Sequence, residues 1–193
     1  MNSKKVRDRT PEELLQRKKE LFAICDILEE MKIDYYLHGG ILLGAMREQN
    51  FIKWDWGVDI RVTLKDFFEK IDLFVEKLKN LGFEILNINK KKNDLKVYFK
   101  GKYPKEVSAY TVFVWNYSKM KDVYWRGQYS IPSKFFNNYS TITFLGRNFK
   151  TPYKLEEYLT FAYGDWKKPL RSSDKDLYNS KNYYKNSLLR YFK

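Results

Sequence analysis

The sequence predicts an α+β fold, with a small mixed β-sheet and helices packed on one of its faces. Helix-like and strand-like segments alternate over the first half of the chain, and strand-like segments dominate the second half. No repeat and no linker divides the 193 residues, a length that suits one medium domain. We therefore expect a single domain over residues 1–193, with its core at about residues 10–170 and a basic, aromatic tail over residues 171–193.

The first helix is predicted from its start signals. Thr10 can act as an N-cap, Pro11 suits the first helical position, and two acidic residues follow. Apolar residues then recur at helical spacing, and the helix should end near Lys32. Further helices are expected over residues 41–48, over residues 64–82 with Thr63 as the cap, within residues 131–137 and over residues 153–164.

Strands are predicted where β-branched and aromatic residues run between Gly, Pro and Asn positions. Residues 34–38 have the pattern of a strand that stops at two glycines, and residues 57–62 have the pattern of a second strand. The remaining strands are expected over residues 83–89, 95–101 and 107–117 and in a hairpin over residues 141–152, with Gly146 and Arg147 at or near its bend.

The charge and the counts of reactive residues narrow the classes of function. The net charge of +13 is consistent with an anionic partner, such as a nucleotide, a phosphorylated glycan, nucleic acid or a membrane surface, and equally with a lysine-rich proteome. The single cysteine, Cys25, excludes an internal disulfide bond, and the single histidine, His38, excludes multi-histidine zinc sites. The sequence has no apolar run of about 20 residues and no apolar signal core, so the expected location is the cytoplasm.

Gly39 and Gly40 lie where the first strand should pass into a helix. Glycines at that place allow a tight turn and let a ligand approach the backbone, and the free N–H groups of the following helix suit a phosphate. Arg47, near the end of that helix, can add a positive charge for the same anion. Many turns share this pattern, so by itself it indicates only a candidate phosphate site.

The stretch "DWGVD" carries the candidate acids. Alternate residues of a strand project from one face, so two carboxylates at i and i+2 can hold Mg²⁺ together. Here Asp59 is present, but the position two residues before it is Gly57. Asp55 lies four residues back, about 13 Å along an extended strand, and it can share an ion with Asp59 only if the chain bends or bulges at Gly57.

Four motifs in order, over residues 35–169, resemble the LicD/fukutin family of nucleotidyltransferase-fold phosphotransferases. They are "HGGILLGAMREQNFIKWDWGVDI", "YSIPSKFF", "FLGRNFKTP" and "PYKLEEYLTFAYGDWKKP". The resemblance implies a nucleotidyltransferase-like fold and a metal-dependent enzyme. Such an enzyme transfers a phospho-alcohol, of the phosphocholine or ribitol-phosphate type, from a CDP-linked donor to a cell-surface glycan or its lipid-linked precursor. Contact with the membrane periphery is a further expectation.

The resemblance also assigns roles to residues in the first motif. Gly39, Gly40 and Arg47 would border the donor phosphates, and Asp59 would bind Mg²⁺ or Mn²⁺. Asp55 stands at the family's first acid, which is more often structural than coordinating, and it is a second candidate for a catalytic or metal-binding role.

For two further residues the sequence allows either a role in substrate binding or an ordinary structural role. His38 directly precedes the glycine turn and can contact substrate, or it can simply form a hydrogen bond at the strand end. Lys96, on a strand expected beside the acidic one, can face the donor phosphates or be a solvated strand lysine.

Two departures from the family pattern concern the metal. Gly57 stands where the middle acid is expected, and Thr111, in "AYTVFVW", stands where a third acid is expected. Either the site has moved, with Glu106 recruited, or metal-dependent catalysis is impaired. The alternatives to an active transferase are therefore a catalytically impaired nucleotide-binding relative and a basic nucleic-acid-binding protein. The second is disfavoured, because the basic residues are spread along the chain without a recognisable binding motif.

Overall fold

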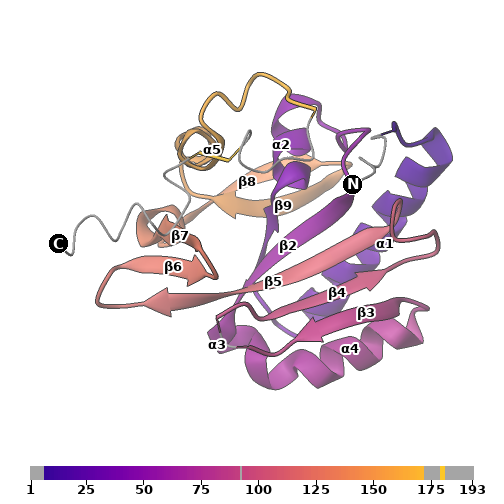
Figure 1. Ribbon diagram of the computed structural model, residues 1–193, viewed down its shortest axis with the longest axis horizontal. Helices are drawn as coiled ribbons and strands as arrows, with labels where there is room; N and C mark the ends of the chain where they lie inside the picture. Colours follow the sequence, from indigo (N-terminus) through magenta and orange to yellow (C-terminus); the bar gives the residue numbers. More distant parts are fainter. Residues whose placement is uncertain (1–6, 92, 172–178, 181–193) are drawn as a thin grey trace, which may run out of the picture.

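The computed structural model describes residues 7–91, 93–171 and 179–180. A mixed sheet with the strand order β1-β2-β5-β4-β3 forms its centre, as Figure 1 shows. Strands β2 and β5 are parallel, and the other neighbours on this path are antiparallel, so the predicted mixed sheet is confirmed. These strands are β1 (Tyr35–His38), β2 (Gly57–Thr63), β3 (Glu84–Asn89), β4 (Lys96–Lys100) and β5 (Ala109–Ser118).

Two hairpins complete the strands. β6 (Val123–Arg126) pairs with the far end of β5 and with β7 (Tyr129–Pro132), which leads into the 3-10 turn η2 (Ser133–Phe135). The sequence pattern predicted neither β6 nor β7, because four-residue strands offer little alternation to recognise, and the short helix expected within residues 131–137 is the 3-10 turn η2. The predicted second hairpin is confirmed as β8 (Tyr139–Phe144) and β9 (Arg147–Pro152), and its two turn residues have the positive φ values, 54° and 88°, that such turns require.

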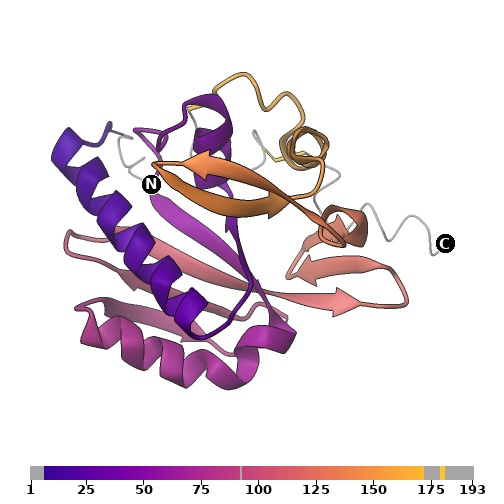
Figure 2. The ribbon, with the colours of Figure 1, turned by 180° about the vertical axis from the view of Figure 1, so that it is seen from behind.

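Helices α1 (Pro11–Glu30) and α4 (Ile71–Asn80) cover one face of the sheet, seen from behind in Figure 2. Thr10 caps α1 as predicted: its hydroxyl oxygen accepts from the Glu13 N–H at 3.3 Å, and the Glu13 carboxylate accepts from the Thr10 N–H at 2.8 Å. Alternate residues of the strands point toward these two helices and are almost fully buried. On the two central strands these residues are Val58, Ile60, Val62, Tyr110, Val112 and Val114.

The helix predicted over residues 64–82 is interrupted. The short helix α3 (Leu64–Phe67) and the 3-10 turn η1 (Phe68–Lys70) precede α4. The Lys70 ammonium donates to the Met31 carbonyl oxygen at 2.9 Å, just beyond the end of α1. The interruption therefore lies at Lys70, whose ammonium caps the carboxyl end of α1.

Two more helices lie away from the face that α1 and α4 cover. α2 (Gly40–Arg47) begins two residues after β1 ends and packs against β1, β2 and β8, whereas α5 (Leu155–Tyr163) packs against β9. Both views place them with the β8–β9 hairpin. The expectation of helices on one face of the sheet therefore holds for α1 and α4 but not for α2 and α5.

Two expectations concern the outer parts of the chain. Within the described residues, no helix is both long enough and apolar enough to cross a membrane. The basic, aromatic tail predicted over residues 171–193 lies outside the described residues except for Arg171, Asn179 and Ser180.

Candidate functional site

The glycine turn between β1 and α2 has the geometry that requires glycine. Gly39 has a φ of +68°, which residues with a side chain rarely adopt, and it is the N-cap residue of α2. Its carbonyl oxygen accepts from the N–H groups of Leu42 and Leu43 at 3.2 and 3.3 Å, so the helix starts at once. The first N–H groups of a helix have no partner within the helix, and this turn presents them beside β2.

Asp59 faces this turn from the neighbouring strand. In the register of the sheet it lies between His38 of β1 and Thr111 of β5. A side-chain carbon at Gly39 would lie 3.1 Å from Asp59 Oδ2, so the carboxylate is directly beside the glycine. The structure therefore brings together three residues predicted for the site: His38, Gly39 and Asp59.

Asp55 lies beside the second glycine of the same turn. A side-chain carbon at Gly40 would lie only 1.8 Å from Asp55 Oδ2, so the carboxylate occupies the space that any larger residue at position 40 would need. Burial raises the pKa of the Asp55 carboxyl, while the Arg17 guanidinium and the N–H groups of Trp56 and Gly57 act in the opposite direction. A carboxylate at the start of α2 is also favoured by the positive end of the helix dipole.

The bend that lets both acids reach one turn does not lie at Gly57. The Asp55 N–H donates to the Ile52 carbonyl oxygen at 3.0 Å, which closes a turn before the strand. From Gly57 onward, β2 runs in unbroken register with β5. The straight-strand separation considered in the sequence therefore does not apply, because Asp55 lies in a turn and only Asp59 lies on the strand.

The two positions where further acids were expected lie on the same face as Asp59. Thr111 is the direct register partner of Asp59, and Gly57 precedes Asp59 by two residues. A side-chain carbon at Gly57 would lie 3.0 Å from the Ala109 carbonyl oxygen, a contact too close to form without a small shift. This face of β2 and β5 therefore carries a carboxylate at Asp59 and none at the two neighbouring positions.

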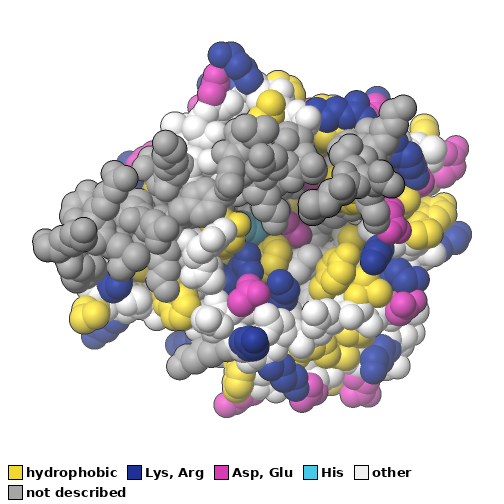
Figure 3. All heavy atoms as spheres, in the orientation of Figure 1, with side chains coloured by type: hydrophobic (Ala, Val, Ile, Leu, Met, Phe, Trp, Pro, Cys, Tyr) yellow, Lys and Arg dark blue, Asp and Glu magenta, His cyan; other side chains and the backbone are white. Residues whose placement is uncertain are grey.

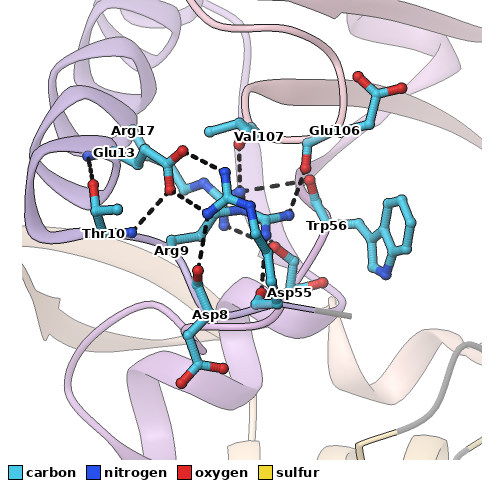
Figure 4. A network of polar contacts seen from close by, with 10 residues as sticks. Asp8, Arg9, Thr10, Glu13, Arg17, Asp55, Trp56, Glu106 and Val107 are labelled. Carbon is cyan, nitrogen blue, oxygen red and sulfur yellow. Dashed lines mark hydrogen bonds and ion pairs between the residues drawn. The ribbon is translucent and has the colours of Figure 1, made fainter. Parts of the chain in front are cut away.

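The donor set fits a metal ion only in part. Among the residues that the structure describes, no group of three or more His, Cys, Asp or Glu side chains is placed to hold a metal. Mg²⁺ is commonly held by one or two carboxylates together with substrate phosphates and water. Asp59 can provide one such carboxylate, and Asp55 is engaged with the N–H groups of Trp56 and Gly57. Glu106 does not fill the gap, since its carboxylate points away from Asp55 in Figure 4.

His38 and Arg61 bound the site along the sheet. The buried His38 ring packs edge-on against Phe113 and Trp115, with ring centroids 6.0 and 5.7 Å apart. Arg61, two residues beyond Asp59 on the same face, is buried with its guanidinium 3.4 Å from the ring centroid of Phe136 and 4.6 Å from that of Trp115. Aromatic side chains thus enclose a fixed positive charge next to the carboxylate.

Arg47 is held at the other end of α2. Its guanidinium donates to the Trp166 carbonyl oxygen at 3.3 Å and lies 3.8 Å from the Glu48 carboxylate. Burial lowers the pKa of Arg47, and the charges of Glu48 and Asp55 act in the opposite direction. Arg47 therefore ties α2 to the "YGDW" segment while its charge still acts on Asp55.

The prediction that the strand of Lys96 lies beside the acidic strand was wrong. Its strand, β4, pairs with β5, so β5 separates Lys96 from the acidic strand β2. The Lys96 ammonium donates to Asp94 Oδ2 at 3.3 Å, and the Arg126 guanidinium donates to Asp94 Oδ1 and lies 4.0 Å from the Phe113 ring centroid. Figure 3 shows that basic and acidic side chains also gather near the middle of the face seen in Figure 1.

The pairing of Asp94 with Arg126 is a feature that no sequence pattern reveals. The two residues are 32 positions apart and come from a loop and from the unpredicted strand β6. The only signal was the isolated arginine in "YWRGQY", which fits a solvated strand end equally well.

Comparison with known proteins agrees with the family that the first three motifs indicate, and the match ends before most of the fourth motif. A family model described as "LicD/FKTN/FKRP, nucleotidyltransferase domain" matches residues 32–154. The ribitol 5-phosphate transferases FKRP of Mus musculus and Homo sapiens are each 42% identical to the chain over 43 residues. That alignment spans 22% of this chain and 9% of the length of each relative.

Solved structures show a similar fold at low sequence identity. The solution structure of the antibiotic-resistance factor ANT(2'')-Ia has a TM-score of 0.50 and 10% identity, over 72% of this chain and 66% of that chain. The crystal structure of an antigenic nucleotidyltransferase-like protein from Paracoccidioides brasiliensis has a TM-score of 0.46 and 17% identity, over 79% of this chain and 66% of that chain. At this identity the first similarity concerns the fold alone, and it agrees with the nucleotidyltransferase domain that the family model describes.

Proposed function

The chain belongs to the LicD/FKTN/FKRP family of nucleotidyltransferase domains, and on that premise we propose that it transfers a phospho-alcohol from a CDP-linked donor to a glycan hydroxyl. The transferred group would be of the phosphocholine or ribitol-phosphate type, and the acceptor a glycan or its lipid-linked precursor. The observation that carries the proposal is the convergence of Asp59 and the start of α2 on the Gly39 turn.

The donor phosphates would bind at the start of α2. The helix presents N–H groups and the positive end of its dipole there, beside the Asp55 carboxylate that fills the space at Gly40. The net charge of +13 favours the approach of a donor with an anionic diphosphate. Arg47 adds positive charge to α2, although its guanidinium is held by the Trp166 carbonyl oxygen rather than extended toward the turn.

The proposed reaction is a displacement at phosphorus. The acceptor hydroxyl forms a new P–O bond to the phosphorus that bears the alcohol. The P–O bond from that phosphorus to CMP breaks, the bridging oxygen and its electron pair leave with CMP, and the hydroxyl proton passes to water. Such transfers depend mainly on positioning and on stabilising charge that develops on the phosphoryl oxygens. In this chain the start of α2 would supply that stabilisation, and Asp55 would hold the turn in place from beneath Gly40.

A divalent metal, Mg²⁺ or Mn²⁺, is part of the proposal only through Asp59. When bound, such an ion would neutralise charge on the donor phosphates. Asp59 can contribute one carboxylate, and the remaining ligands would come from the donor and from water.

The second candidate is a relative that binds the nucleotide without turnover. Gly57 and Thr111 favour it, since each stands on the face of Asp59 where a second carboxylate would be needed. The two candidates share the same donor site and differ only in whether the acceptor is modified.

The test compares Asp59→Asn with a matched control by isothermal titration of CDP-ribitol and CDP-choline, each with Mg²⁺ and with EDTA. Asp72→Asn is the control, because it removes the same charge from an exposed position on α4. We expect donor binding by wild type, a loss of at least tenfold in the presence of Mg²⁺ for Asp59→Asn, and no change for Asp72→Asn.

Two outcomes would contradict the proposal. If wild type does not bind the donor, the proposed donor site is wrong. If wild type and Asp59→Asn bind the donor with equal affinity, Asp59 has no role in donor binding. Release of CMP with labelling of an acceptor glycan distinguishes the transferase from the binding relative.

A further inference from the structure

Helix α1 contributes a buried arginine to the loop that carries Asp55. Arg17 is 1% exposed. Its Nη1 and Nη2 atoms both donate to the Asp55 carbonyl oxygen at 3.2 Å, and Nη2 also donates to the Val107 carbonyl oxygen at 2.6 Å. One guanidinium therefore bonds two segments that lie 38 and 90 positions away from it in the sequence (Figure 4).

The two segments lead into the strands that form the site. The Asp55 carbonyl lies two residues before β2, and the Val107 carbonyl lies two residues before β5. These strands are parallel, so the two leading segments lie at one edge of the sheet, where carbonyl groups have left the ladder of strand hydrogen bonds. A planar guanidinium with several fixed donors can bond both carbonyls at once.

A second arginine repeats this arrangement nearer the start of the chain. The Arg9 guanidinium donates to the Glu106 carbonyl oxygen at 2.6 Å, and the Arg9 N–H donates to the Lys53 carbonyl oxygen at 2.8 Å. The same two loops are thus bridged twice by residues that precede the segment matched by the family model, which begins at residue 32.

We infer that Arg17 is a positioning residue of the site. It fixes the segments leading into β2 and β5 so that the Asp55 carboxylate stays beneath Gly40 and Asp59 stays beside Thr111. The inference rests on the proposed function for its effect on donor binding, but the geometric part stands without it. The N-terminal helix then belongs to the site as well as to the core.

The experiment compares three variants of the full chain. Arg17→Met keeps the length of the side chain but removes its donors, and Arg17→Lys keeps a charge and can reach one carbonyl. Arg147→Met is the matched control, because Arg147 also attaches α1, through ion pairs of 2.7 Å with Asp26 and Glu29, but at the end of the helix away from the site. Amide hydrogen exchange and titration with CDP-ribitol are measured for each variant.

We expect faster exchange in residues 53–59 and 106–109 for Arg17→Met than for Arg147→Met, after correction for global stability. Arg17→Lys should fall between wild type and Arg17→Met, and donor affinity should decline at least tenfold in Arg17→Met and less in Arg17→Lys. Unchanged exchange in both segments in a folded Arg17 variant would overturn the inference. If Arg17→Met does not fold, unchanged hydrogen exchange of both segments in Arg17→Lys would overturn the inference, and faster exchange would support it.

Donor binding separates this inference from the proposed function. If wild type binds no CDP-linked donor, the proposed function fails, and the exchange data still decide whether Arg17 positions the segments leading into the two strands. If wild type binds the donor and Arg17→Met binds it equally well, the positioning role fails, and the proposed function stands.

Discussion

The two faces of the central sheet are built by the same strands and serve different purposes. On the face under α1 and α4, residues such as Ile60 and Val112 are apolar and at most 1% exposed. Their sequence neighbours Asp59 and Thr111 lie on the opposite face and are partly exposed. Because successive residues of a strand point to opposite faces, one position separates core from candidate site.

This difference explains how the acidic motif can change while the fold persists. A side chain on the site face contributes little to packing, so a glycine or a threonine at positions 57 and 111, where the family pattern predicts acids, leaves the apolar face intact. A polar residue on the opposite face would remove buried apolar contacts and leave an unpaired group. Substitutions on the site face can therefore change the chemistry of the site without destabilising the fold.

The largest expected effect tests the apolar face. Phe99 of β4 is fully buried and packs against Phe83 and Tyr110, with ring centroids 5.5 and 5.7 Å apart. We expect Phe99→Ala to lower the free energy of unfolding by about 3–5 kcal/mol, because it removes apolar contacts and leaves a cavity. Urea denaturation measures the change.

The adjacent aromatic residue provides the control. Tyr98 points to the site face as the register partner of Thr111 and is partly exposed. Tyr98→Ala should cost less than half as much as Phe99→Ala. Equal losses for the two variants would mean that the two faces do not differ in their contribution to stability.

The apolar face was predictable because its signals are local. The alternation of the strands and the cap at Thr10 each involve residues a few positions apart, and both are confirmed. The glycine turn and Asp59 were also accessible, since the turn follows β1 directly and the antiparallel pairing of β1 with β2 brings Asp59 back beside it.

The rest of the site depends on contacts that no local pattern encodes. Lys96 was expected beside the acidic strand, but β5, which follows β4 in the sequence, inserts between β2 and β4. Arg17 had the pattern of an ordinary helix residue, and its partners Asp55 and Val107 become adjacent only when the sheet is formed. Strand order and buried polar contacts are tertiary properties, so they required the structure.

An intermediate effect tests the site face. Thr111→Asp places a carboxylate directly beside Asp59, and Gly57→Asp places one two residues before it on the same face. We expect Thr111→Asp to increase the Mg²⁺-dependent affinity for a CDP-linked donor about tenfold, or about 1.4 kcal/mol. Gly57→Asp should gain less, because its side chain meets the Ala109 carbonyl oxygen at 3.0 Å.

Isothermal titration with Mg²⁺ and with EDTA measures both gains. A gain that persists in EDTA would show that the new carboxylate acts without a metal. No gain in a correctly folded Thr111→Asp variant would contradict the interpretation of this position as a lost acid.

The smallest expected effect lies at the start of α1, where neither face of the sheet is involved. The Glu13 carboxylate accepts from the Thr10 N–H at 2.8 Å and from the Arg7 guanidinium at 2.5 and 2.9 Å. The hydrogen bond from Arg7 lowers the pKa of Glu13 to about 2, although burial acts in the opposite direction. We expect Glu13→Gln to lower the free energy of unfolding at pH 7 by about 1 kcal/mol.

The sign of the pH dependence follows from that lowered pKa. The folded state binds the Glu13 proton more weakly than the unfolded state, whose pKa is near the ordinary value of 4.5. The stabilisation is therefore complete above pH 4.5 and declines as the pH decreases toward 2. Urea denaturation at pH 7, 5 and 3 should show the difference between wild type and Glu13→Gln shrinking across that window. Glu76→Gln, at an exposed position on α4, controls for the change in net charge. A difference that stays constant from pH 7 to pH 3 would show that the charge of Glu13 adds nothing to the stability of the protein.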